Sequence, residues 1–176
     1  MLFRSDLIEA VGVLHHLADP FAGWRKLLSF LKPGGFMNIG LYSRTARQDV
    51  AAARSFLSGH GLVAHDISEA RRRLIEAGSF ATIAERPDFY TTSNCRDLLF
   101  HVCEHQLDLG EVATFLQENS LNLLGFWAEA PVLAAYQRRF PDDPAAINLD
   151  HWRDFEAENP HSFSGMYQFW VQKTLS

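Results

Sequence analysis

Two apolar runs separated by a helix-start signal follow one another within the first 43 residues of the chain. Residues 6–14 form a short, mostly apolar run, which is typical of a strand buried on both faces of a parallel sheet. Asp19 and Pro20 then provide an N-cap and a first helical residue, and apolar side chains follow at helical spacing. Residues 32–35, Lys-Pro-Gly-Gly, predict the end of that helix, and residues 36–42 form the second apolar run. This order of strand, helix and strand predicts a βαβ unit with parallel strands and a right-handed crossover.

The rest of the chain predicts mainly helices, followed by two further strands, so the fold class is α/β. We expect helices in residues 45–85, 95–105, 109–118 and 130–158, a loop in residues 86–94, and strands in residues 122–128 and 166–173. These assignments predict a single domain over residues 1–176. A helical, lid-like insertion occupies residues 44–108 of that domain, and a helical insertion at residues 129–165 separates the last two strands.

Composition argues against several classes of partner. The net charge is −5, and Lys and Arg form no stripe, so the electrostatic attraction that dominates nucleic-acid binding is missing. Apolar runs are broken by His, Asp or Pro before they reach membrane-spanning length. We therefore expect no nucleic-acid partner and no membrane partner. Cys95 and Cys103 make neither a disulfide framework nor a metal motif, which fits a reducing cytoplasm.

Nearly the whole chain, and most strongly its first 43 residues, resembles class I S-adenosylmethionine (SAM)-dependent methyltransferases. Residues 6–17, Asp-Leu-Ile-Glu-Ala-Val-Gly-Val-Leu-His-His-Leu, are followed by Asp19-Pro20 and then by residues 31–35, Leu-Lys-Pro-Gly-Gly. This combination is similar to the fourth strand, the next helix and the fifth strand of that family. The resemblance implies a partial Rossmann-like methyltransferase sheet, from the fourth strand onward. It also implies a terminal antiparallel hairpin, made by residues 123–126 and 167–171, and SAM as the cofactor.

One part of the family pattern has no counterpart in this sequence. The family's first strand ends in a glycine-rich turn and its second strand ends in an acidic residue, which bind the cofactor. Gly34 and Gly35 are no substitute, because they follow a predicted helix rather than a strand. Residues 2–5 also match the translation of a sequencing-adapter tail. We therefore expect the C-terminal half of a methyltransferase, inactive by itself.

The residues that end the first predicted strand are the main candidates for a site. By resemblance, Gly12, Val13, Leu14 and His15 would face the methionine portion of the cofactor, with Gly12 allowing close approach. His15 and His16 are candidate bases or substrate contacts, and we expect them to point to different sides. The alternatives are a glycine required for packing between helix and sheet, and a histidine that is hydrogen-bonded for structural reasons.

Four further side chains are candidates for contact with the methyl acceptor. Tyr42 ends the second predicted strand, at the same rim as His15. Tyr90 lies in a loop, residues 88–92, that could fold over the mouth of the site as a lid. Arg96 and His101 follow it and could hold an anionic or polar substrate. Tyr42 has the alternative role of capping the sheet.

The sequence of residues 101–105 also fits the short zinc pattern H-x-x-E-H. On a helix, His101 and His105 would share one face, with Glu104 beside them. A zinc hydrolase is therefore a remote alternative, but no recognisable third ligand follows, so we expect no metal site.

Two interpretations of different classes remain open. The first is methyl transfer from SAM to an unidentified small molecule or protein in the intact parent enzyme. The second is a non-catalytic, methyltransferase-like interaction module. For either, the exposed edge of the sheet would allow pairing with another chain, including a second copy.

Overall fold

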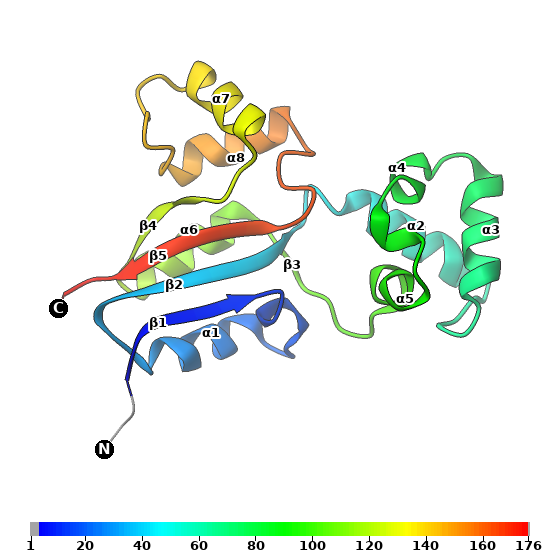
Figure 1. The fold of residues 1–176 in the computed structure, drawn as a ribbon, viewed down its shortest axis with the longest axis horizontal. Helices are drawn as coiled ribbons and strands as arrows, with labels where there is room; N and C mark the ends of the chain where they lie inside the picture. Colours follow the sequence, from blue (N-terminus) through cyan, green and yellow to red (C-terminus); the bar gives the residue numbers. More distant parts are fainter. Residues whose placement is uncertain (1–3, 176) are drawn as a thin grey trace. The chain divides into compact units, whose positions relative to one another are not determined.

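The apolar runs at the two ends of the chain form one mixed sheet in the computed structural model, which describes residues 4–175. The strand order is β1 (Ser5–Val11), β2 (Leu31–Ser43), β5 (Tyr167–Lys173) and β4 (Leu121–Phe126), and the short strand β3 (Gln106–Leu107) pairs with the end of β2 (Figure 1). Strands β1 and β2 are parallel, whereas β5 is antiparallel to both β2 and β4. The expected α/β class, the βαβ unit and the terminal antiparallel hairpin are confirmed.

The described chain divides into two compact units, whereas the sequence analysis assigned it a single domain. The first unit comprises Met1–Ala46 and Cys103–Ser176, and the second comprises Arg47–Val102. The second unit lies within residues 44–108, where the sequence predicts a helical insertion. Each unit has its own hydrophobic core.

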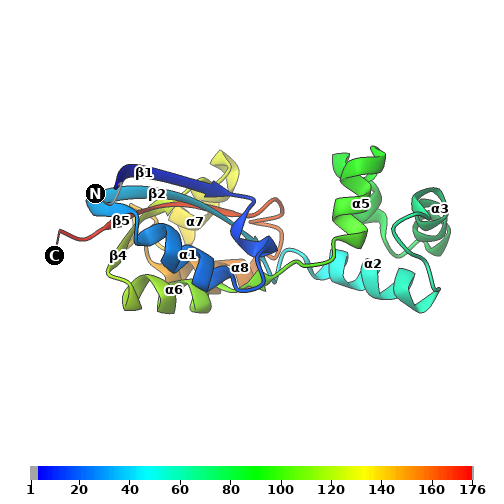
Figure 2. The ribbon, with the colours of Figure 1, turned by 90° about the horizontal axis from the view of Figure 1, so that it is seen from below.

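Helix α1 (Pro20–Leu28) forms for the reasons that its sequence suggests. The Asp19 carboxylate accepts a hydrogen bond from the backbone N–H of Ala22, and Pro20 occupies the first turn. Trp24 is buried, and its ring stacks on Phe115 of helix α6 (Leu109–Glu118), with ring centres 4.1 Å apart. Both helices lie on the same side of the sheet (Figure 2).

The two faces of the sheet differ in burial. Three pairs of neighbours on β2 and β5 are completely or almost completely buried on one face: Met37 with Val171, Ile39 with Phe169, and Leu41 with Tyr167. On the opposite face, Leu7 of β1 lies beside Phe36 of β2, and these side chains are 55% and 40% exposed. The core of the first unit therefore lies on the face that α1 and α6 cover.

Two expected element boundaries in this region are wrong. Strand β1 ends at Val11 rather than at Leu14, and Leu14–His16 form a 3-10 turn. Residues 32–35 do not stop the helix, because α1 ends at Leu28 and β2 already begins at Leu31. A Cβ atom on Gly35 would lie 3.0 Å from the carbonyl oxygen of Asp6, so the glycine serves the close approach of β1 to β2.

The insertion between β4 and β5 contains the expected helices, α7 (Ala130–Arg139) and α8 (Leu149–Glu158). Their aromatic side chains extend the core of the first unit. The ring of Trp152 stacks on Tyr136 at 4.0 Å, and its indole N–H donates to the carbonyl of Ala146. The Tyr136 hydroxyl donates to the Asp143 carboxylate, so the polar atoms of these two stacked rings are satisfied.

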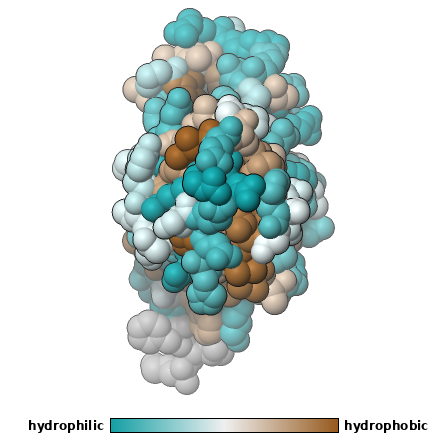
Figure 3. Space-filling view, turned by 90° about the vertical axis from the view of Figure 1, so that its right-hand side faces the viewer, coloured by the Kyte–Doolittle hydropathy of each residue, from teal (hydrophilic) through white to brown (hydrophobic). Residues whose placement is uncertain are grey.

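The second unit consists of α2 (Gln48–Gly59), α3 (Ile67–Ala77), α4 (Ala81–Ala84), a 3-10 turn at Pro87–Phe89 and α5 (Thr92–Phe100). Its core includes Leu57, Leu74 and Phe89. Two boundaries again differ from the expectations, because α5 starts inside the predicted loop and ends at Phe100 rather than at His105. Hydrophilic side chains predominate in the space-filling view from the side on which α3 lies in Figure 1 (Figure 3). Within the described range, no helix is both long enough and apolar enough to cross a membrane.

The close contact between β1 and β2 provides a test of this packing. A Cβ atom at Gly40 would lie 2.9 Å from the Val11 Cα atom and 2.8 Å from its Cγ1. We expect Gly40→Ala to lower the free energy of unfolding by about 1–3 kcal/mol, because the backbone of β1 cannot move aside freely. Gly59→Ala is the control, since a Cβ atom there meets no atom within 4 Å, and it should leave stability unchanged or raise it slightly. Urea unfolding followed by circular dichroism measures both. Equal stability of the two variants would contradict the observed packing.

Candidate functional site

The chain leaves β1 through a glycine with an open environment. Gly12 has φ +74°, a conformation that disfavours other residues, and a Cβ atom there would meet nothing within 4 Å. Packing between helix and sheet therefore does not account for this glycine. Val13 is 52% exposed, whereas the side chain of Leu14 is buried in the core. Of the predicted cofactor contacts, Gly12 and Val13 thus reach the surface, and Leu14 can contribute only its backbone.

Three aromatic side chains meet at the ends of β1 and β2. The His15 ring is buried and stacks on Tyr42, with ring centres 3.9 Å apart. The ring of His16 lies 4.3 Å from that of His15, so the expectation that the two histidines point to different sides is wrong. His16 is half-buried, and its Nδ1 atom lies 3.1 Å from the carbonyl oxygen of Cys103. The structure therefore brings together three of the predicted site residues.

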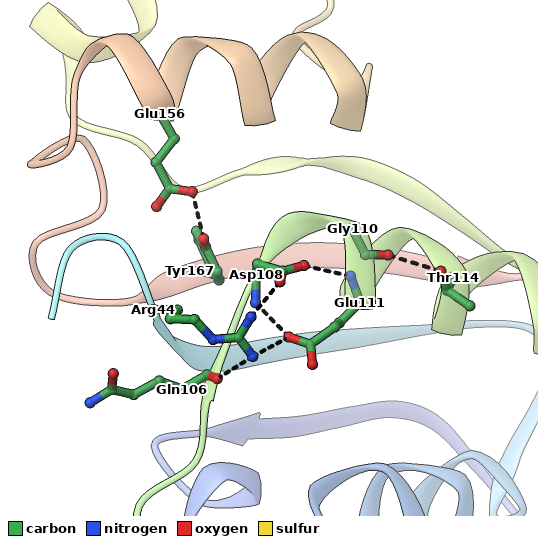
Figure 4. A network of polar contacts seen from close by, with 8 residues as sticks. All are labelled: Arg44, Gln106, Asp108, Gly110, Glu111, Thr114, Glu156 and Tyr167. Carbon is green, nitrogen blue, oxygen red and sulfur yellow. Dashed lines mark hydrogen bonds and ion pairs between the residues drawn. The ribbon is translucent and has the colours of Figure 1, made fainter. Parts of the chain in front are cut away.

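A buried carboxyl group bonded to Ser43, the residue that follows Tyr42, was not predicted from the sequence. Glu156 of α8 is 3% exposed, and its carboxylate accepts hydrogen bonds from Ser43 Oγ at 2.5 Å and from the Tyr167 hydroxyl at 2.7 Å (Figure 4 shows the bond to Tyr167). Burial raises the pKa of Glu156, although the two hydrogen bonds oppose the shift. Burial and the neighbouring Glu156 also raise the pKa of Tyr167. The network ties α8 to the strand end that carries Tyr42.

An ion-pair network lies at the start of α6. Arg44 donates to the carboxylates of Asp108 and Glu111 and to the carbonyl of Gln106 (Figure 4). Asp108 and Glu111 also form a reciprocal capping box, in which each side chain accepts from the other's backbone N–H. The spacing of Asp108 and Glu111 is a signal that sequence analysis could have used. The role of Arg44 has no such local signal.

The other predicted acceptor contacts belong to the second unit. Tyr90 is 69% exposed, and Arg96 is exposed, with its Nε atom donating to the carbonyl of Ala64 at 3.3 Å. His101 is half-buried and directly follows the last residue of α5. Residues 88–92, the predicted lid, contain the end of a 3-10 turn and the N-cap of α5, Thr91.

The premise of the zinc interpretation is wrong. Because α5 ends at Phe100, His101 and His105 do not share a helix face. Residues 4–175 contain no group of three or more His, Cys, Asp or Glu side chains arranged to hold a metal ion.

The buried Glu156 carboxyl predicts a particular dependence of stability on pH. Because its pKa in the folded chain lies above the usual 4.5, its favourable contribution is complete below pH 4.5 and is lost as pH rises through the folded value. We therefore expect Glu156→Gln, which removes this titration, to become more stable relative to the unmodified chain as pH increases above 4.5. Thermal unfolding at a series of pH values measures the difference.

Glu158→Gln, on the same helix, is the matched control with the opposite sign. The hydrogen bond from Arg139 lowers the pKa of Glu158, so its contribution is present above pH 4.5 and is lost as pH falls through the folded value. Glu158→Gln should therefore lose stability relative to the unmodified chain as pH rises. The same trend in both variants would contradict the assignment of Glu156 as a buried, unfavourably ionised group.

Comparisons with known proteins show which sequences and structures this chain resembles. No family model matches the chain. Two curated relatives match in part: an uncharacterized Synechococcus protein, 47% identical over 45 residues, and phosphoethanolamine N-methyltransferase 1 of Arabidopsis thaliana, 26% identical over 128 residues. These matches cover 26% and 69% of this chain, but only 11% and 24% of the relatives.

Solved structures match over nearly the whole chain. PKMT2 from Rickettsia typhi superposes with a TM-score of 0.71 and 13% identity, over 97% of this chain and 36% of that one. The same protein in complex with AdoHcy gives a TM-score of 0.64 and 12% identity, over 100% of this chain and 36% of that one. The chain thus spans about a third of the length of these neighbours. With its strand order, its terminal antiparallel hairpin and these neighbours, the chain has a class I SAM-dependent methyltransferase-like fold.

Proposed function

We propose that this chain forms part of an enzyme that transfers a methyl group from SAM to a small molecule or a protein. The observation that carries the proposal is the sheet, in which β1 and β2 are parallel and β5 runs antiparallel between β2 and β4. A protein with this fold has been solved with AdoHcy, the product that SAM leaves after methyl transfer. The net charge of −5 supports a small-molecule or protein acceptor over a nucleic acid. The sequence contains only two cysteines, Cys95 and Cys103, which supports a reducing compartment such as the cytoplasm.

The residues at the end of β1 fit only part of the cofactor. Gly12 presents open backbone, and Val13 presents an exposed apolar side chain. Both features suit contact with the methionine portion of SAM. In the described chain, no strand is followed by a glycine-rich turn of the kind that approaches a nucleotide. We propose that polypeptide outside these 176 residues supplies those contacts, so that this chain is inactive by itself.

Tyr42 and His16 are the best placed side chains for the acceptor. SAM supplies an electrophilic methyl group, and methyl transfer then depends mainly on alignment of the acceptor. Tyr42 and His16 are half-buried and lie at the carboxyl ends of the strands. His16 would accept a proton where the acceptor must lose one, and the buried His15 would position Tyr42 through their ring contact. Contacts of Tyr90, Arg96 and His101 with the acceptor remain predictions.

A second candidate function is favoured by the free edge of β1. In the strand order, β1 has a neighbour on one side only, and its exposed Leu7 continues an apolar surface formed with Phe36. Parallel strands are normally covered, and an open edge invites pairing. On this proposal the chain is an interaction module that pairs β1 with a second copy of itself.

A titration with S-adenosylhomocysteine tests the first proposal. We expect amide NMR shifts confined to Gly12, Val13 and His16, with a dissociation constant of about 1 mM. Gly12→Ala should abolish these shifts, because alanine is strained at the φ of +74° and its Cβ atom blocks the approach of the ligand to the backbone. Gly61→Ala is the control, since Gly61 has a similar φ of +70° and equally open surroundings in the second unit. Micromolar affinity would contradict the need for further polypeptide, and unchanged spectra at millimolar ligand would contradict the role of Gly12.

Sedimentation velocity tests the second proposal. We expect concentration-dependent dimers that Leu7→Lys weakens, because lysine charges block edge-to-edge pairing. Leu124→Lys, on the opposite edge strand β4, should leave association unchanged. A chain that stays monomeric at all concentrations, or equal effects of the two substitutions, would contradict pairing through β1.

A further inference from the structure

Trp127 directly follows β4 and is the most exposed tryptophan of the described chain, with 73% of its side chain exposed. Strands β2 and β4 are both antiparallel to β5, and β1 is parallel to β2, so β1, β2 and β4 run in the same direction. Trp127 therefore lies at the carboxyl edge of the sheet, the edge at which Gly12 and Tyr42 also lie.

A β-bulge in β4 turns Trp127 away from the core. Between Leu123 and Phe126, three residue steps on β4 oppose two on β5, and Gly125 in this bulge has φ +145°, which favours glycine. The extra residue places Phe126 on the same side as Leu123, packed against the core, so the next side chain projects to the opposite side. Without the bulge, Trp127 would share the face of Leu123. Bulges of this kind re-aim side chains, often beside active sites.

The backbone around Trp127 is fixed, whereas two side chains there are uncommitted. The N–H of Trp127 donates to the carbonyl of Gln168 at 2.7 Å and continues the pairing of β4 with β5. Within residues 4–175 the Trp127 ring stacks on no other ring, and the Glu129 carboxylate takes part in no hydrogen bond or ion pair. Glu129 is extended, and alternate residues of an extended chain project to the same side. An indole ring and a carboxylate are therefore presented together.

An apolar strip connects Trp127 with the end of β1. Val11, Gly40 and Gln168 are neighbours across β1, β2 and β5, and the Trp127 N–H bonds to the last of these. A Cβ atom at Gly40 would lie 2.8 Å from Val11 Cγ1 and 2.7 Å from Met166 Sδ, so these two side chains lie together over the glycine. Adjacent strands are about 4.8 Å apart, which places Trp127 roughly 14 Å from Val11 across the sheet.

We infer that Trp127 and Glu129 bind a cationic group of the methyl acceptor, either an ammonium or a guanidinium. Tryptophan is the aromatic side chain that attracts cations most strongly, and a carboxylate beside it adds a charged acceptor. The inference rests on the proposed function and names the class of acceptor. This acceptor carries a positive charge roughly 14 Å from the atom that receives the methyl group at the end of β1.

Butylammonium is a suitable probe for the cation, with 1-butanol and butyrate as neutral and anionic analogues of the same chain length. We expect butylammonium to shift the amide NMR signals of residues 127–129, and 1-butanol to bind about fivefold more weakly. Butyrate should cause no such shifts. Equal binding of butylammonium and 1-butanol would overturn the inference.

The titration needs no cofactor, so its failure is separable from failure of the proposed function. Absence of butylammonium shifts in a chain whose Gly12 responds to S-adenosylhomocysteine would overturn this inference alone. Butylammonium shifts in a chain that does not respond to S-adenosylhomocysteine would overturn the assignment of the cation to a methyl acceptor.

Three substitutions at exposed positions separate the site from general electrostatics. Trp127→Leu keeps an apolar side chain but removes the aromatic face, and should weaken butylammonium binding about fivefold. Glu129→Gln should weaken it about threefold, because it removes the carboxylate. Glu118→Gln removes the same charge from an exposed position of α6 and should have no effect. The amide signals of residues 128–129 report binding in all three variants. Equal effects of Glu129→Gln and Glu118→Gln would show that net charge alone governs binding and would overturn the site.

Discussion

The pairing of β2 along both of its edges is the constraint on which the first unit depends. Strand β2 pairs in parallel with β1 and antiparallel with β5, so its central residues are paired with neighbouring strands on both sides. Met37, Ile39 and Leu41 of β2 are also fully buried on the face that the helices cover. A strand fixed in this way positions Tyr42 and Ser43 at the carboxyl end of β2. His15 lies at the same edge of the sheet, in the turn that follows β1. The arrangement of the candidate site therefore follows from the register of the sheet together with the 3-10 turn, Leu14–His16, that follows β1.

The Glu156 network shows how the insertion after β4 is joined to this rim. A carboxyl group in the core is costly when ionised, and two hydroxyl donors offset only part of that cost. In return, both oxygens of one side chain fix the end of β2 and the start of β5 to α8. The aromatic packing of Trp152 and Tyr136 supplies the apolar stabilisation that an isolated polar contact would lack.

Local signals explain what could be predicted from the sequence. The N-cap at Asp19 and the order of the apolar runs depend on neighbouring residues, so they predict α1 and the parallel β1–β2 pair correctly, whereas the terminal antiparallel hairpin is implied by the family resemblance. The same local reasoning failed at residues 32–35, where Pro and Gly signal the end of a helix but in fact allow close approach of two strands. Ser43 and Glu156 are 113 residues apart, and no periodicity or motif connects them, so their contact required the structure. The meeting of Tyr42 and His15 was anticipated only as a shared rim, because ring stacking depends on side-chain packing.

The two cores divide the chemistry of the chain. The apolar residues of the sheet core and those of the helical unit form separate clusters with no member in common. His16 and Tyr42 belong to the first unit, whereas Arg54 and His101 belong to the second. A change in the helical core is therefore expected to leave the ladder of β2 in place. Separate cores allow the methyltransferase-like sheet and the helical unit to be altered independently, because each is stabilised by its own buried residues.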